Sequence, residues 1–164
     1  ANGFNMWILL RRAMWSPSDI PFLLGLTPKH TGLTLFFIFI AIAVHLFIRS
    51  LKQNKHKHSV LFVFFIAFVH LGFNIILTGT HERYLYHLYP LLLICILGLP
   101  TLNQKSFKAI FILGSSIYGI YVFSVLIDNR LWPYPVAGFH YVLLLLLTLF
   151  FYRFSKGNEA QSVA

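Results

Sequence analysis

The four residues at 81–84, His-Glu-Arg-Tyr, are the part of this 164-residue sequence best suited to chemistry. Three of them are ionisable, and they lie between two apolar stretches. Charges at the edge of hydrocarbon are costly unless they are paired or hydrated, so such a cluster indicates a function. Arg83 could hold a phosphate through its planar fork of donors, and His81 could add another donor. Glu82 could orient either of them or accept a sugar hydroxyl. The alternative is a hydrated interfacial turn in which Glu82 pairs with Arg83.

A polar stripe precedes this segment. His70, Asn74 and Thr78 recur every four residues, which predicts one polar face on a helix that leads toward His81. Polar side chains avoid lipid, so this face should point at neighbouring helices or at a water-filled cavity. Hydrogen bonding between helices is one reading, and lining the way to the 81–84 segment is the other.

Other histidines raise the question of a bound metal or haem. His45 and His70 could be axial ligands of a haem, but their depths, counted from the ends of their apolar stretches, differ by about 6 Å. The Lys-His-Lys-His run at 55–58 could bind a metal, although a solvated turn explains it more simply. Cys95 is the single cysteine and should be a buried thiol. We therefore expect no cofactor in these residues, and a divalent metal stays open for a longer enzyme.

The composition is that of an integral membrane protein. Hydrophobic residues make up 58% of the chain and charged residues 10%, whereas ordinary globular domains carry roughly 25% charged residues. Continuous apolar runs recur, each close to the roughly 20 residues that a helix needs to cross a bilayer. The net charge of +9 would favour nucleic acid in a soluble protein. Here the basic residues lie in short loops between apolar runs, so membrane orientation and lipid headgroups explain them, and no nucleic-acid partner is expected.

The sequence predicts an all-α membrane bundle with an N-terminal interfacial helical segment. About five transmembrane helices are expected, at 33–50, 60–79, 84–102, 109–127 and 139–154. Residues 1–32 form the interfacial segment, in which Trp7 and Trp15 lie near arginines and suit the headgroup level. A turn or helix cap is expected at 16–19. Residues 155–164 form a polar tail.

Basic residues also predict the orientation of the chain in the membrane. Cytosolic loops are enriched in Lys and Arg, and one set of loops holds Arg49, Lys52, Lys55, Lys57, Lys105, Lys108, Arg153 and Lys156. The other set holds fewer basic residues and three of the four acids, Asp19, Glu82 and Asp128. We therefore expect a multi-pass protein, of a bacterial plasma membrane, with a cytosolic C-terminus. The 81–84 segment should face outward or into a lumen.

The start of the sequence has neither an initiator Met nor the pattern of a signal peptide. We expect the chain to be the C-terminal part of a longer membrane protein.

Two short motifs resemble a known enzyme family. The segment 81–86, His-Glu-Arg-Tyr-Leu-Tyr, followed by Pro90 and a Leu-rich run, resembles the His-Glu-Arg-Tyr segment of polytopic GT-C-type glycosyltransferases. It is also similar to the His-Lys-Glu-x-Arg-Phe element of eukaryotic mannosyltransferases of lipid-linked glycan assembly. Asn5 and Trp7 resemble the Asn-x-Trp segment found upstream in bacterial members. Gly25-Leu26-Thr27 with Gly32 fits the same layout.

The resemblance implies transfer of a sugar, a hexose such as mannose, from a polyprenyl- or dolichyl-phosphate carrier to an acceptor on the non-cytosolic side. His81 and Arg83 would contact the carrier phosphate, Glu82 would hold them or touch the acceptor, and Tyr84 would pack beneath the site. Other residues would line it: Asn5, Trp7, His70, Asn74 and Thr78.

The chain departs from the family pattern at two points. His87 stands where relatives commonly have a proline. The catalytic acid of the family lies in an early outward loop, and neither Asp19 nor Asp128 has that context, so no catalytic residue is assigned and this piece alone should be inactive. The main alternative is a non-enzymatic transporter or flippase for lipid-linked sugars, which would also need a basic outward site.

Overall fold

The computed structural model describes Trp7 and residues 25–55, 57–78, 80, 82–98, 105–126 and 133–156. The regular elements of the described residues are all helices, which confirms the predicted all-α bundle. In chain order they are α2 (Pro28–Gln53), α3 (His58–Ile76), the 3-10 helix η1 (Glu82–His87), α4 (Leu88–Gly98), α5 (Lys105–Leu126) and α6 (Pro133–Ser155). The predictions for 8–24 and 157–164 lie outside the described residues.

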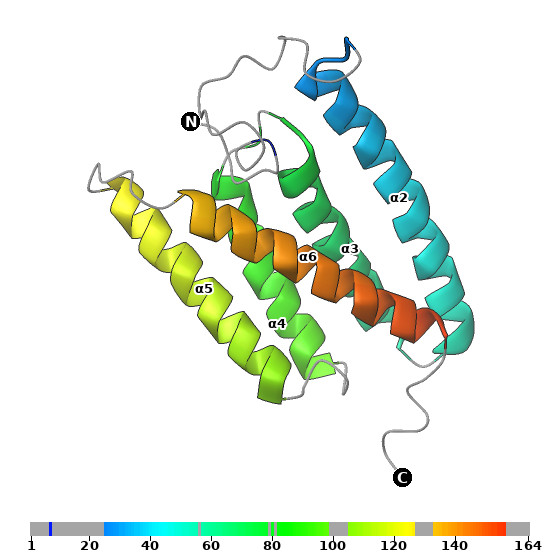
Figure 1. The fold of residues 1–164 in the computed structure, drawn as a ribbon. Coiled ribbons are helices and arrows are strands. Elements are labelled where there is room, and N and C mark those ends of the chain that lie inside the picture. Colours follow the sequence, from blue (N-terminus) through cyan, green and yellow to red (C-terminus); the bar gives the residue numbers. More distant parts are fainter. Residues whose placement is uncertain are drawn as a thin grey trace.

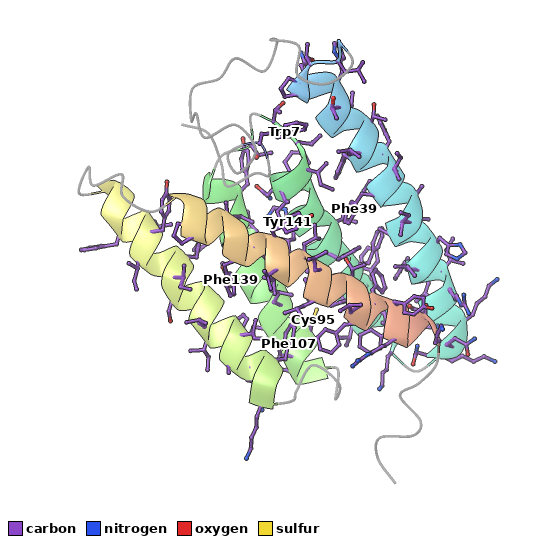
Figure 2. All side chains as sticks on the ribbon, in the orientation of Figure 1. Trp7, Phe39, Cys95, Phe107, Phe139 and Tyr141 are labelled. Atoms are coloured by element: carbon purple, nitrogen blue, oxygen red, sulfur yellow. The ribbon has the colours of Figure 1, made fainter. Side chains whose placement is uncertain are left out.

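Helix α3 is the central element of the bundle (Figure 1). It packs against α2, α4 and α6, while α5 lies along α4 and α6 on the far side from α2. Phenylalanines join these helices. Phe64 and Phe68 of α3 both meet the ring of Phe151 of α6 edge to face, and Phe68 also packs on Phe39 of α2. Figure 2 shows Phe39 directed into the space between α2 and α3. Cys95 is buried in the core, as expected.

A polar contact crosses the interior between α4, α5 and α6. The hydroxyl of Tyr89 on α4 lies 2.8 Å from Nε2 of His140 on α6 and 3.0 Å from the carbonyl oxygen of Gly114 on α5. Nδ1 of His140 lies 2.7 Å from the carbonyl oxygen of Val136, one turn earlier in α6. A carbonyl oxygen only accepts, so Nδ1 carries a proton. Buried polar groups are costly unless they are hydrogen-bonded, and this network satisfies both ring nitrogens.

Among the described helices, three are long and apolar enough to cross a membrane: Pro28–Gln53, His58–Ile76 and Pro135–Ser155. The apolar part of α5 and the segment Tyr84–Gly98 are shorter. The outer faces of α2, α5 and α6 expose large apolar side chains, among them Phe37, Ile42, Ile120, Phe123 and Leu149. Patches of this kind are uncommon on soluble monomers.

Caps and prolines shift several helix boundaries from the predicted ones. α2 begins at Pro28 rather than at 33, because Thr27 caps it by accepting from the backbone N–H of His30 and Pro28 suits the first turn. α6 begins at Pro133 rather than at 139, since a proline at a helix start gives up no hydrogen bond. α3 ends at Ile76 rather than at 79.

The predicted span at 84–102 consists of two elements, η1 and the 11-residue α4. Pro90 has no N–H, and its ring crowds the carbonyl four residues earlier, which disfavours an α-helix just before it. The chain is instead a 3-10 helix there. Six residues at about 2.0 Å and 11 at about 1.5 Å give up to about 28 Å of rise, close to the thickness of the hydrocarbon core.

Candidate functional site

The candidate site lies where α3 ends and η1 begins, and this region is called the η1 end of the bundle below. After Ile76 the chain leaves the helix, and Thr80 turns back to it. The buried hydroxyl of Thr80 donates to the carbonyl oxygen of Asn74 at 3.1 Å. That carbonyl belongs to the last turn of α3 and lacks a helical N–H partner, since the helix ends two residues later. The bond therefore brings the chain back against α3 immediately before the 81–84 segment.

His70 fastens the middle of η1 to α3. Its Nε2 is hydrogen-bonded to the carbonyl oxygen of Tyr84. Because a carbonyl oxygen only accepts, the proton is on Nε2 and His70 is the donor. The ring of His87, at the end of η1, lies edge to face with the His70 ring at 6.2 Å between centroids. One side chain of α3 thus contacts both the middle and the end of the short helix that carries the motif.

Trp7 joins the same region from the other end of the chain. Its indole Nε1 donates to the carbonyl oxygen of Ile76 at 2.8 Å, and the side chain is buried. Ile76 is the last residue of α3, so this carbonyl also lacks a helical partner. Figure 2 shows Trp7 at the end of the bundle where α3 finishes.

Gly32 of α2 makes this contact possible. A Cβ at this position would lie 2.9 Å from the Ile76 carbonyl oxygen and 3.3 Å from Nε1 of Trp7. The first distance is shorter than real Cβ contacts allow and the second is tight, so a larger residue would push α2 away from this hydrogen bond. The indole, the first turns of α2 and the last turn of α3 therefore form one packed unit.

The polar stripe differs from the predicted one in its last member. The Nδ2 of Asn74 donates to the carbonyl oxygen of His70 at 2.9 Å, and both lie on α3. Thr78 is half-buried but follows the end of the helix, so it does not continue the face. Thr80 takes its place as the residue that bonds to Asn74. The Oδ1 of Asn74 is buried and has no hydrogen-bond partner among the described residues.

Tyr84 holds the site in a different way from the expected one. Its side chain is 41% exposed, and its carbonyl oxygen accepts the bond from His70. The neighbouring Leu85 is fully buried in the core and packs η1 against the bundle. Sequence analysis missed Leu85 and Thr80, although the burial of one side of η1 could have been inferred from the Leu85 and Leu88 spacing.

Four predicted site residues fall partly or wholly outside this description. Asn5 and His81 lie outside the described residues. Glu82 and Arg83 form the first turn of η1, and their side chains lie outside the description. The structure thus places the backbone of Glu82, Arg83 and Tyr84 beside the last turns of α3, where Tyr84 is bonded to His70.

Neither a haem nor a metal is favoured by the described histidines. His45 is exposed on the outer side of α2, and the Nε2 of His70 is already engaged by Tyr84. Within the described ranges, no three His, Cys, Asp or Glu side chains come together as metal ligands would.

The opposite end of the bundle carries most of the described cations. A group of basic side chains lies where α2 and α6 end and where α3 and α5 begin, and this region is called the basic end below. Its described members are Arg49, Lys52, Lys55, Lys57, Lys105, Lys108, Arg153 and Lys156. Val60 packs under Gly98 and Phe107 packs on Phe150, which places these helix ends together. The 19 residues of α3 separate the two ends by about 27 Å.

Comparison with known proteins identifies no relative, since no family model, curated protein or solved structure matches the chain.

Proposed function

We propose that this chain is part of a membrane glycosyltransferase of the GT-C type, which takes a sugar from a polyprenyl-phosphate carrier. The observation that carries the proposal is that one residue of each family-like motif is hydrogen-bonded to the same end of α3. Trp7 and Tyr84 are far apart in sequence, yet both are hydrogen-bonded to the last two turns of α3, through Ile76 and His70. A shared anchor is what two segments of one active site require, because substrate groups must be held within fractions of an ångström.

The membrane location of this site is part of the proposal. It is supported by three helices of sufficient length and by the apolar side chains exposed on their outer faces. The basic end would face the cytosol, since short cytosolic loops are rich in Lys and Arg. The η1 end, about one helix length away, would then lie at the non-cytosolic boundary, where the carrier presents its phosphate.

The proposed reaction inverts the configuration of the sugar. A carboxylate takes the proton of the acceptor hydroxyl, and the hydroxyl oxygen attacks the anomeric carbon. The bond from that carbon to the carrier phosphate breaks, and the electron pair leaves on the phosphate oxygen. Arg83 and His81 would stabilise the charge that develops there, in the manner of an oxyanion hole. By the family resemblance, the carboxylate would come from an early outward loop of a longer enzyme.

The proposal is tested by two variants that each remove one positive charge, Arg83→Ala and the control Lys29→Ala. In membranes that contain the full-length protein, Arg83→Ala should reduce sugar transfer from a polyprenyl-phosphate hexose by about 100- to 1,000-fold, the usual cost of losing one such donor. The transfer rate of Arg83→Lys should lie between that of the parent protein and that of Arg83→Ala, because lysine keeps the charge but not the bidentate fork. Lys29→Ala removes the same charge from the exposed start of α2 and should transfer normally.

Unchanged turnover of Arg83→Ala, with normal membrane insertion, would contradict the proposal. Movement of the lipid-linked sugar across the bilayer without transfer to any acceptor would favour the transport alternative.

A further inference from the structure

The basic end contains a more specific arrangement where α2 and α6 meet. The Nδ2 of Asn54, just after α2, donates to the carbonyl oxygen of Ser50 at 3.0 Å and to that of Phe154 at 3.1 Å. The first carbonyl belongs to the last turn of α2 and the second to the last turn of α6. One amide thus caps both helices and fixes their ends against each other.

Cations from both helices surround one tyrosine at this junction. The Lys156 ammonium lies 4.7 Å from the centre of the Tyr152 ring. Arg49 is exposed near the end of α2, and Asn54 holds this end of α2 against the end of α6. Because Asn54 engages the terminal carbonyls of Ser50 and Phe154, these cations are not needed to cap them. None of the described side chains is acidic, so no described carboxylate pairs with these cations.

The same two helices present apolar ladders that lead away from the cations. On α2, Ile38 and Ile42 are exposed and share a helical face with Arg49 and with His45, which is also exposed and lies between them. On α6, Leu145 and Leu149 are exposed and share a face with Tyr152 and Lys156. Each face therefore begins with two exposed apolar side chains and ends at a cation, with His45 between them on α2 and Tyr152 between them on α6. A phospholipid has the same order, with acyl chains followed by a phosphate.

We propose that the α2–α6 junction binds an anionic phospholipid, whose phosphate is held by Arg49, Lys156 and the Tyr152 hydroxyl and whose acyl chains lie along the two ladders. The site lies at the opposite end of the bundle from η1, so it is separate from the proposed transfer site. Bound lipid would hold the end of α2 to α6. Most of α2 is otherwise exposed, so the lipid should stabilise the bundle by mass action.

The test uses the full-length protein in nanodiscs of neutral phosphatidylcholine, into which phosphatidylglycerol is titrated. Native mass spectrometry should detect retained phosphatidylglycerol, and the Tm should rise with its mole fraction. Arg49→Gln/Lys156→Gln should weaken retention roughly tenfold or more, since each cation near a charged headgroup contributes a large share of the binding. The matched control is Lys105→Gln/Lys108→Gln, which removes the same charge from the same end, on α5. It should retain the lipid.

Three results would contradict the proposed lipid site. Equal loss in both double variants would mean attraction to a basic surface in general. An equal Tm rise with glycerophosphate, which lacks acyl chains, would mean a free-phosphate site. Absence of any dependence on phosphatidylglycerol would mean that no such site exists. The single variants Arg49→Gln and Lys156→Gln are measured as well, so a folding failure of the double variant, detected by its Tm in neutral discs, leaves the test intact.

Discussion

Two histidines inside the bundle illustrate different uses of the same side chain. His140 is fully buried, and both of its ring nitrogens meet partners within the helices that it joins. His70 is only half-buried, and its partner is the backbone of η1, a segment outside the α-helices. One turn further on, Asn74 keeps a buried oxygen without a partner in the described part of the chain. The network of His140, in which both ring nitrogens have partners, is called the closed network below, and it is typical of a structural role. The network of His70 and Asn74 keeps spare hydrogen-bonding capacity where the chain turns, which is typical of a binding site.

The largest expected effect is on the closed network. His140→Ala removes a buried ring and leaves the hydroxyl of Tyr89 without one of its partners, so the free energy of unfolding should fall by about 3 kcal/mol. Thermal unfolding in detergent checks this. The per-molecule transfer rate of the folded fraction should stay near that of the parent protein. A large loss of rate with unchanged stability would place His140 in the site and remove the contrast with His70.

Gly32→Ala should have the next largest effect. The new Cβ would press on the Ile76 carbonyl oxygen and on the Trp7 indole, so α2 must shift from the end of α3. Overpacking of this kind costs about 1–3 kcal/mol. Hydrogen exchange should increase in the last turn of α3 and in η1. Gly119→Ala is the matched control, because a Cβ there meets nothing within 4 Å. Equal effects of the two substitutions would mean that the contact at Gly32 is unimportant.

His70→Ala should produce the reverse of the His140 result. The lost hydrogen bond is worth about 1 kcal/mol of stability. The transfer rate should fall much further, by roughly tenfold or more, because a misplaced motif loses catalytic alignment. His70→Gln can still donate to the Tyr84 carbonyl and should recover part of the rate. A rate that follows stability alone would assign His70 a purely structural role.

Trp7→Phe should have the smallest overall effect of these substitutions. Phenylalanine keeps most of the buried ring and removes only the donor to Ile76, at a cost of about 1 kcal/mol. Limited proteolysis near the end of α3 should become faster while overall unfolding changes little. Unchanged proteolysis would mean that the hydrogen bond does not hold this end of α3.

The apolar runs were enough to predict five helices, because continuous hydrophobic stretches leave few alternatives in a membrane-like composition. Their ends were harder to predict, since Thr27, Pro28 and Pro133 add turns of helix outside the apolar runs. The 3-10 geometry before Pro90 was missed as well. Proline signals a break, but not which local helix replaces the α-helix.

The types and spacing of the residues indicated a candidate site, but they did not indicate the hydrogen bonds that hold its segments against α3. His70 and Asn74 were expected to avoid lipid, and both have hydrogen-bond partners within the described chain. The bonds from Trp7 to Ile76 and from Thr80 to Asn74 end on backbone carbonyls. Every residue has such a carbonyl, so no side-chain pattern indicates which one a donor will reach.

The most direct measurement of the central claim, that η1 lies at the non-cytosolic boundary, is labelling from outside intact cells. In a Cys95→Ala background, Tyr86→Cys reports on η1 through an exposed position, and Lys55→Cys reports on the basic end. A membrane-impermeant maleimide should label Tyr86→Cys in intact cells and Lys55→Cys only after permeabilisation. The opposite pattern would invert the bundle in the membrane and contradict the proposed phosphate site.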